Sequence, residues 1–346
     1  MTTVRRARLN KIGWEDSLVV ETSDEEFIEL ESNQVRVEVD ACGVCHRDCI
    51  DRSGRFKFIQ IPVTPGHEAV GRVLAVGPDV TDWRVGDRVG TLHRDFCGSC
   101  TPCKEGNESL CENAAALLGL IIDGGYATHM TVPQRCLFGV PEGIPAPDAA
   151  VLHCTFGTSY RGLKRSGLIG ANSHVLVTGA NGGVGTAAIQ VALRLGASVT
   201  AIVRDEAQQA YVTELGATHV IVDPGDGFHK RLSGGTADVI MECVGQPTFN
   251  ASLRSLRPGG RVIVIGNVVQ EPATVNLGLV VTKGLQIIGS SGATREDMKE
   301  LLALHQEKPF RVHLHEQVDL EEADRAQRAV QAGGLRGRIV LVPKRG

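Results

Sequence analysis

The chain has 346 residues, of which 42% are hydrophobic and 22% charged, which fits a soluble globular protein of two domains and excludes disordered and fibrous classes. The net charge of -4 provides no basic field, so we expect neither nucleic acid nor an anionic membrane as a partner. No apolar run reaches about 18 residues, the minimum for a membrane-spanning helix. The ten cysteines fit a reducing compartment in which most of them hold metal, so we expect a cytoplasmic protein.

Short strands are predicted in the first part of the chain. From about Val35 to Val140, runs such as VRVEVD, VGRVLAVG and GDRVGTL alternate or are rich in β-branched residues, and Gly and Pro interrupt them. Such alternation is typical of strands that bury one face. The pattern predicts an all-β, barrel-like domain.

Three candidate ligands for a catalytic metal are spread along this region and its end. Cys45 lies in the run ACGVCHRD, His67 lies in PGHE some 20 residues later, and Cys154 lies in HCTFGT. Two thiolates and one imidazole bind zinc and leave one coordination position open, as in catalytic zinc sites. Each residue alone would more simply be a buried thiol or a core histidine, but the combination favours a metal site.

Four further cysteines lie in a loop rich in Gly, Pro and Lys, with the spacing Cys-x2-Cys-x2-Cys-x7-Cys. Four thiolates can surround one Zn²⁺ tetrahedrally, and the glycines allow a tight loop to direct all four inward. We therefore predict a closed, structural zinc site, with an iron-sulfur cluster and disulfides as the alternatives. The four ligands are Cys97, Cys100, Cys103 and Cys111.

The sequence pattern changes from about Ala149. Strand-like runs, HVLVTG, SVTAIV, THVIV, ADVIMEC, GRVIVIG and LQIIGSS, alternate with helical stretches, one of them from Val184 to Leu195. This alternation predicts a parallel, doubly wound sheet and hence an α/β fold class. Two amphipathic stretches and a final strand, GRIVLVP, follow Thr294, and we expect this tail to pack on the first domain.

The run VLVTGANGGVG follows a predicted strand and opens a predicted helix. Glycines at such a turn permit close approach of the backbone to a pyrophosphate, which the N-terminus of the helix also attracts. At the first βα turn of six alternating strands, the run predicts an NAD(P) site rather than a merely structural turn. The residues assigned to the cofactor are Gly179, Asn181, Gly182, Gly183, Val184 and Gly185.

The end of the next strand bears on the choice of cofactor. An Asp or Glu there would hydrogen-bond the ribose 2′-hydroxyl of NAD. The strand from Val199 to Val203 is followed instead by Arg204, whose guanidinium could neutralise the 2′-phosphate of NADP. Asp205 comes one position later, and a solvated surface arginine is the alternative interpretation. We predict NADP(H) in preference to NAD(H).

The motifs GVCHRD, PGHEAVGRV, VGDRV, the four-cysteine loop and GANGGVG occur in this order. With them, essentially the whole chain resembles the zinc-containing medium-chain dehydrogenase/reductases, the alcohol dehydrogenase superfamily. The resemblance implies a GroES-like catalytic domain, residues 1–150 and 290–346, with two zinc ions per chain, and a Rossmann NAD(P)-binding domain, residues 151–289. It also implies hydride transfer between the nicotinamide and a substrate carbon whose oxygen zinc polarises.

The resemblance assigns roles to further residues. The three candidate ligands match those of the catalytic zinc, and Asp48 and Glu68 match carboxylates that hold or tune these ligands. His46 matches a position that contacts the cofactor pyrophosphate, and Thr158 matches one beside the nicotinamide. Taken singly, these residues would be surface charges, an exposed histidine and a helix cap.

The sequence departs from alcohol dehydrogenases at the proton relay. The residue two positions after the zinc cysteine is usually Ser or Thr, and a His three residues further on often continues the relay. Here these positions are Arg47 and Ile50. Arginine stays protonated and has no hydroxyl, so Asp51 and His93 become candidate substitutes. Arg47 could also bind an anionic substrate or a cofactor phosphate.

The string Cys-x-Arg-Asp, with TSYRGLKRSG, VIGNV, NLGL and GSSGATREDM, also resembles the acryloyl-CoA reductase branch, which reduces an activated C=C bond. We predict an alcohol dehydrogenase-type oxidoreductase that acts on an alcohol, aldehyde or ketone. Reduction of an enone or enoyl thioester is the alternative. A non-enzymatic NAD(P)-binding module is a third hypothesis, although such a module would be expected to lose the catalytic ligands. Because relatives are dimers or tetramers, we expect a homodimer or homotetramer.

Overall fold

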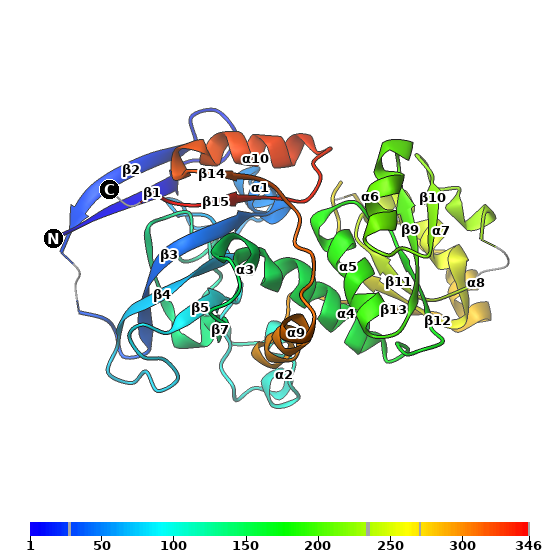
Figure 1. The fold of residues 1–346 in the computed structure, drawn as a ribbon, viewed down its shortest axis with the longest axis horizontal. Helices are drawn as coiled ribbons and strands as arrows, with labels where there is room; N and C mark the ends of the chain where they lie inside the picture. The colour runs from blue at the N-terminus through cyan, green and yellow to red at the C-terminus, as the bar shows by residue number, and fades with distance from the viewer. Residues whose placement is uncertain (27–28, 233–235, 270, 345–346) are drawn as a thin grey trace. The chain divides into compact units, whose positions relative to one another are not determined.

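The chain divides into two compact units in the computed structural model (Figure 1). The first unit comprises Met1–Cys154, Thr294–Glu307 and His313–Gly346. The second unit comprises Thr155–Ala293 and Lys308–Val312. The structure describes residues 1–26, 29–232, 236–269 and 271–344.

The first unit is built around a mixed sheet of seven strands. These are β3 (Gln34–Val44), β4 (Ala69–Val76), β5 (Arg88–Thr91), β6 (His129–Pro133), β7 (Leu137–Gly139), β14 (Leu314–Val318) and β15 (Arg338–Leu341). Their order is β14-β15-β3-β4-β5-β7, with β6 paired to β3, and only the β14–β15 pair is parallel. The valines at 35, 37 and 39 of β3 are buried in the core of this unit. An antiparallel hairpin, β1 (Thr2–Leu9) and β2 (Leu18–Glu25), lies outside the sheet.

The described residues of the first unit form five α-helices. They are α1 (His46–Arg52), α2 (Thr101–Lys104), α3 (Ala146–Leu152), α9 (Arg295–Glu307) and α10 (Ala323–Ala332). Three short 3-10 helices accompany them, at Glu108–Leu110, Gln134–Cys136 and Leu320–Glu322. Helix α3 packs on β3 and β4, and α10 packs on α1. The C-terminal tail thus supports β3 and α1, which are consecutive in the chain.

The second unit is a parallel sheet of six strands in the order β10-β9-β8-β11-β12-β13. Its strands are β8 (His174–Val177), β9 (Ser198–Val203), β10 (His219–Val222), β11 (Ala237–Glu242), β12 (Leu256–Val264) and β13 (Gln286–Gly289). Its helices are α4 (Thr158–Ser166), α5 (Gly183–Arg194), α6 (Gln209–Glu214), α7 (Gln246–Ser255) and α8 (Leu277–Lys283), with 3-10 helices at Glu206–Gln208 and Phe228–Lys230. The strand order reverses between β8 and β11, as in doubly wound nucleotide-binding folds. The predicted α/β class, with a β-rich part and a doubly wound parallel sheet, is confirmed.

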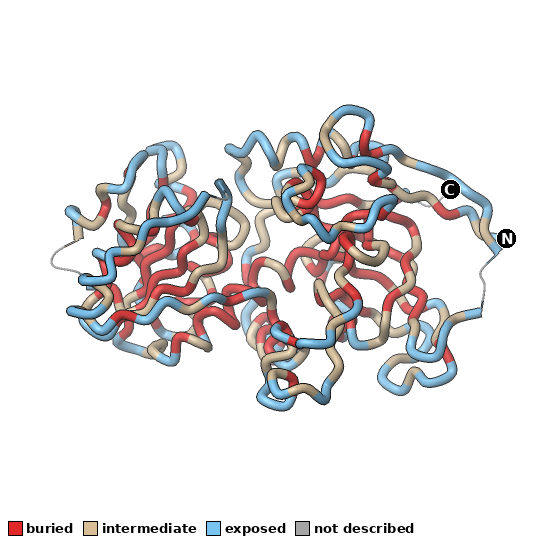
Figure 2. The backbone as a smooth tube through the Cα atoms, turned by 180° about the vertical axis from the view of Figure 1, so that it is seen from behind, coloured by how far each residue is buried: buried red, intermediate tan, exposed pale blue. Residues whose placement is uncertain are grey.

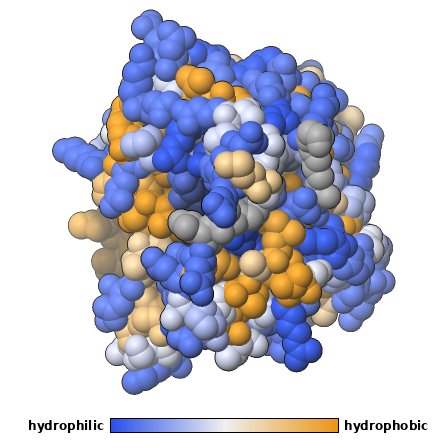
Figure 3. Space-filling model, turned by 90° about the vertical axis from the view of Figure 1, so that its left-hand side faces the viewer, coloured by the Kyte–Doolittle hydropathy of each residue, from blue (hydrophilic) through white to orange (hydrophobic). Residues whose placement is uncertain are grey.

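Burial follows the sheets in both units. Figure 2 shows the buried residues concentrated on the central strands, with exposed residues on the connecting loops. The face drawn in Figure 3 is mainly hydrophilic, and its apolar side chains form separate patches. Among the described residues, no helix combines the length and apolar character needed to cross a bilayer.

Candidate metal centres and nucleotide site

Cys45, His67, Glu68 and Cys154 come together within the first unit. Their ligand atoms all lie within 4.8 Å of one another, and the two sulfur atoms are 3.8 Å apart. Two thiolates bound tetrahedrally to one zinc at ~2.3 Å would also lie about 3.8 Å apart. The hydrogen bond with Cys154 lowers the pKa of the Cys45 thiol well below its usual range, which favours the thiolate that a metal requires. The structure therefore brings the three predicted ligands together and adds a carboxylate.

Cys45 is presented by the junction of β3 and α1. Its sulfur accepts a hydrogen bond from the backbone N–H of Arg47 at 3.5 Å, and Asp48 Oδ2 accepts one from the backbone N–H of Cys45 at 3.0 Å. This reciprocal capping begins α1 inside a region whose alternating pattern predicted only strands. The all-β prediction was wrong here, because a capping cysteine is not one of the usual signals for a helix start.

His67 follows Gly66, a position that has no room for any side chain. Gly66 has a φ of 98°, and a Cβ there would lie 2.4 Å from the Tyr126 ring and 2.8 Å from the sulfur of Cys42. Asp48 Oδ1 lies 3.1 Å from His67 Nδ1, and Asp48 Oδ2 accepts a hydrogen bond from the Tyr126 hydroxyl at 2.9 Å. Asp48 thus orients the imidazole and leaves its Nε2 available as a ligand atom.

Glu68 is fully buried and paired with an arginine from β15. Both carboxylate oxygens lie 2.6 Å from Arg338 Nη2, which also donates to the carbonyl of Val44 at 3.0 Å. Burial raises the pKa of Glu68 to about 7, and Arg338 opposes this shift. Sequence analysis found Glu68 but missed Arg338 and Tyr126. Neither belongs to a local motif, and Arg338 lies 270 residues further along the chain.

Arg47 is fixed by two partners. Its Nε donates to Asp51 Oδ2 at 2.9 Å, and its Nη2 donates to the carbonyl of Leu118 at 2.6 Å. Burial raises the pKa of Asp51 to about 6, although Arg47 lowers it. Asp51, one of the two candidate substitutes for the relay, therefore forms a salt bridge with Arg47. Ile50 is apolar and has no titratable group that could transfer a proton.

His93, the other candidate substitute, stacks on His153 with 5.7 Å between the ring centroids. Burial lowers the pKa of His93 well below its usual range, and the charges on His153 and Arg47 lower it further. Its imidazole is thus neutral near pH 7 and a weak base. His46 is the first residue of α1 and is partly exposed.

The four cysteines of the loop form a second cluster. Their sulfur atoms all lie within 4.8 Å of one another, and all ten cysteines of the chain are free thiols rather than disulfides. Backbone N–H groups point at the sulfurs: Ser99 and Cys100 donate to Cys97 at 3.4 and 3.3 Å. The Ser99 hydroxyl and these N–H groups lower the pKa of Cys97 to about 5. Arg94 and Arg135 donate to carbonyls on either side of the loop and hold it in place.

The glycine-rich turn of the second unit joins β8 to α5. Gly179 has a φ of 55°, and a Cβ at Gly185 would lie 2.3 Å from the carbonyl oxygen of Gly179, so both positions need glycine. Gly182 caps α5, which therefore begins one residue before the predicted start. Asn181 lies in the turn, and Gly183 and Val184 open the helix. The turn leaves the first N–H groups of a helix of 12 residues available to an anion.

The two remaining cofactor candidates are also in the second unit. Arg204 follows β9 directly and is exposed. The carboxylate of Asp205 accepts a hydrogen bond from the backbone N–H of Ala207 at 2.8 Å and so caps the next turn. Thr158 is buried at the start of α4.

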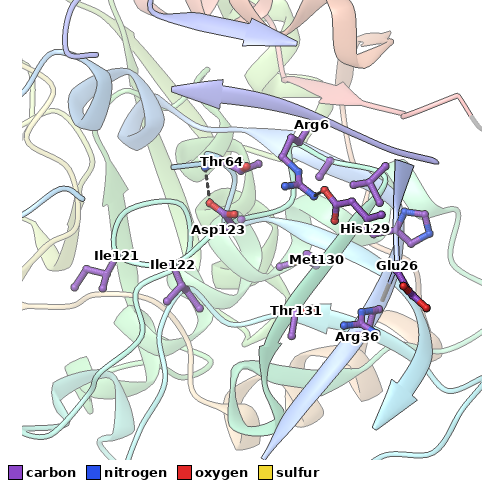
Figure 4. A pocket seen from close by; sticks show the side chains of 14 residues that line it. Arg6, Glu26, Arg36, Thr64, Ile121, Ile122, Asp123, His129, Met130 and Thr131 are labelled. Carbon is purple, nitrogen blue, oxygen red and sulfur yellow. Dashed lines mark hydrogen bonds and ion pairs between the residues drawn. The ribbon is translucent and has the colours of Figure 1, made fainter. Parts of the chain in front are cut away.

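A cavity in the first unit is separate from both cysteine clusters. Figure 4 shows that Arg6, Arg36 and His129 approach it from one side and the segment 121–123 from the other. None of the cysteine-cluster residues lines it. Two of its charged groups form ion pairs, Arg6 with Glu25 at 2.6 Å and Asp123 with Arg8 at 2.7 Å.

Comparison with known proteins identifies the chain's family. Residues 31–142 match the alcohol dehydrogenase GroES-like domain, and residues 183–307 match the zinc-binding dehydrogenase domain. An acryloyl-coenzyme A reductase from Sulfurisphaera tokodaii is 35% identical over 317 residues, covering 90% of this chain and 92% of the relative. The chain belongs to the zinc-binding dehydrogenases. Its predicted membership of the zinc-containing medium-chain dehydrogenase/reductases is thereby confirmed, and it is an oxidoreductase.

Other known proteins resemble the chain along nearly their whole length. An alcohol dehydrogenase from Geobacillus stearothermophilus is 32% identical, covering 93% of this chain and 95% of its own. The crystal structure of AibC has a TM-score of 0.93 at 37% identity, covering 99% of this chain and 97% of that one. An NAD-dependent alcohol dehydrogenase structure has a TM-score of 0.88 at 28% identity, covering 98% and 100%. The relatives named as alcohol dehydrogenases and as an acryloyl-coenzyme A reductase are enzymes, which counts against the non-enzymatic hypothesis.

Proposed function

We propose that this chain is an NADP(H)-dependent zinc oxidoreductase that interconverts an alcohol with an aldehyde or ketone. Cys45, His67 and Cys154 would hold a catalytic zinc, and the four-cysteine loop a structural one. The observation that carries the proposal is the cluster itself, in which two thiols 3.8 Å apart and an oriented imidazole offer three ligands and leave a fourth position for substrate. Zinc bound there would act as a Lewis acid on the substrate oxygen.

The protein's own residues prepare this site. Asp48 fixes the ring of His67, and Arg338 keeps the buried Glu68 compensated, so that the ligands do not need to reorganise when the metal binds. We assign the first unit as the catalytic domain and the second as the nucleotide-binding domain. His46 and Thr158 would contact the pyrophosphate and nicotinamide parts of the cofactor.

The proposed preference for NADP(H) rests on the end of β9. Arg204 is exposed there, and Asp205 is engaged in capping the following turn. A carboxylate engaged in this way leaves Arg204 available to a 2′-phosphate, whereas NAD binding usually relies on an acid that hydrogen-bonds the ribose 2′-hydroxyl.

A second candidate is reduction of an activated C=C bond, as the names of two relatives 35% identical to the chain suggest. The observation that favours it is Arg47, which occupies the usual hydroxyl position and is tied to Asp51 and the Leu118 carbonyl. Hydride delivered to a β-carbon is followed by protonation at the α-carbon, so a relay directed at oxygen is unnecessary.

One spectrophotometric experiment separates the candidates. The oxidation of NADPH and of NADH is followed with a simple aldehyde, a ketone, an enal and an enoyl thioester, and the products are identified. Alcohol products from the aldehyde and ketone support the first candidate. Reduction of C=C bonds alone, with every carbonyl retained, supports the second. Absence of turnover with the whole panel contradicts both.

We also propose that the protein is a cytoplasmic homo-oligomer. All its cysteines are free thiols, which suits a reducing compartment. Strand β13 is an outer strand of its sheet, and Ile287 on it is 43% exposed, as are Val281 and Leu277 of α8 at 78% and 73%. An exposed apolar edge of this kind is stabilised by pairing with a second copy. Sedimentation analysis tests this, and a monomer at micromolar concentration would refute it.

A further inference from the structure

Glu242, the last residue of β11, is a buried carboxylate to which the proposed chemistry gives no role. It has no exposed surface. Its Oε1 accepts hydrogen bonds from the backbone N–H groups of Val244 and Gly245, both at 3.0 Å, and from the Thr248 hydroxyl at 2.7 Å. Its Oε2 accepts one from the hydroxyl of Ser252 at 2.5 Å. A carboxylate withdrawn from water needs such donors, and here they hold the segment 243–248 and α7 in one arrangement.

A further donor connects Glu242 to the glycine-rich turn. The Thr178 hydroxyl donates to Glu242 Oε1 at 2.8 Å and accepts from the backbone N–H of Cys243 at 3.0 Å. Thr178 directly precedes Gly179, at which a Cβ would lie 2.9 Å from a methyl group of Val244. The turn after β8 and the segment after β11 are thus joined by hydrogen bonds and packed side by side.

This connection lies where the order of the parallel strands reverses, between β8 and β11. β8 and β11 are neighbours in the sheet. Strands β9 and β10 lie on one side of this pair, and β12 and β13 lie on the other. In open α/β sheets, ligands bind outside the carboxyl ends of the strands at this point. A change in the spacing of the two segments would therefore change the shape of the phosphate-binding turn.

We propose that Glu242 is a positioning residue of the dinucleotide site and that it acts through Thr178. Its carboxylate fixes the turn at 179–185 against the segment 243–248 and so sets the geometry in which the turn receives a pyrophosphate. The inference rests on the proposed use of NADP(H). Glu242 needs no contact with the cofactor for this role.

Two matched substitutions test the inference, because each removes one hydroxyl donor from the same carboxylate. Thr178→Val cuts the link to the glycine-rich turn, whereas Ser252→Ala cuts only the link to α7. The dissociation constant of NADPH is measured by fluorescence titration, together with that of 2′,5′-ADP, which has no pyrophosphate. We expect Thr178→Val to weaken NADPH about fivefold or more, the equivalent of one hydrogen bond, and to change 2′,5′-ADP less than about twofold. Ser252→Ala should change neither by more than about twofold.

The outcomes are distinguishable from failure of the proposed function. If the wild-type protein does not bind NADPH or NADH, the proposed function fails. If it binds NADPH and Thr178→Val and Ser252→Ala behave alike, or both ligands weaken equally, the positioning role is refuted. Glu242→Gln provides a second test, because its amide oxygen can still accept from the turn while Ser252 reverses its hydrogen bond. It should retain more NADPH affinity than Glu242→Ala, measured well below the unfolding temperature of each variant. Equal affinities would contradict the inference.

Discussion

Replacing Arg338 should destabilise the first unit strongly. Among the described residues, Glu68 forms salt bridges only with Arg338 and with the ring of His67. The Glu68 side chain is fully buried, and that of Arg338 is 11% exposed. Breaking a buried ion pair by removing one partner costs about 3 to 5 kcal/mol, since the remaining carboxyl either stays charged without a partner or has to take up a proton. For Arg338→Met we therefore expect a loss of about 3 kcal/mol in the free energy of unfolding.

The double variant isolates the cause of this loss. With Glu68→Gln added, no charge is left buried, so Glu68→Gln/Arg338→Met should be more stable than Arg338→Met alone by about 2 kcal/mol. Arg325→Met is the matched control. Arg325 pairs with Glu316 at 2.9 Å on the surface of the same unit, at 50% and 39% exposure, and its loss should cost less than about 1 kcal/mol.

Urea denaturation followed by tryptophan fluorescence measures these differences directly. The chain has two tryptophans, Trp14 and Trp83, and both belong to the first unit, so the signal reports the unfolding of that unit. Zinc content is determined for each variant to separate loss of metal from loss of the ion pair. A loss below about 1 kcal/mol for Arg338→Met, or a double variant no more stable than the single one, would refute the reasoning.

Three further predictions concern acid, metal and cofactor. The pKa of Asp51 rises from 3.8 to about 6 on folding, so the folded protein binds this proton more tightly, and the stability contributed by Asp51 falls as pH rises from 4 to 6. Relative to Asp51→Asn, the wild type should lose up to about 3 kcal/mol over this range, and parallel pH profiles would contradict this. Cys103→Ser should remove one zinc ion and lower the midpoint of thermal unfolding of the first unit. The control Cys136→Ser, at a buried cysteine outside both clusters, should keep that zinc ion. Equal zinc contents in the two variants would argue against a structural site. Arg204→Asp should shift kcat/KM from NADPH toward NADH by at least about tenfold, and an unchanged ratio would show that Arg204 does not read the 2′-phosphate.

The parts of the site that could be predicted are those marked by local sequence. Two local requirements make the pattern of the glycine-rich turn visible in the sequence: Gly179 has a φ of 55°, and a Cβ at Gly185 would meet the carbonyl oxygen of Gly179. The four-cysteine loop is equally local. Cys45, His67 and Cys154 are far apart in sequence, and the structure brings them together within 4.8 Å. Their ligand chemistry, rather than their spacing, made them recognisable.

The residues that sequence analysis missed act over long distances. Arg338 reaches Glu68 because β15 pairs with β3, a pairing between the two ends of the first unit that no local pattern encodes. Tyr126 reaches Asp48 across 78 positions. Helix α1 was missed because its capping residue is a cysteine, the candidate ligand Cys45, and the alternation of the surrounding strands masked a helix of only seven residues.

The central claim is that turnover depends on a zinc held by Cys45, His67 and Cys154, and Cys154→Ser tests it most directly. Zinc content, NADPH binding and the rate of NADPH oxidation with the best substrate are measured on the same preparation as the wild type. The account predicts two zinc ions per wild-type chain and one in the variant, with NADPH still bound and turnover reduced about a thousandfold or more. A variant that keeps both zinc ions, or that turns over within about tenfold of the wild type, would contradict it.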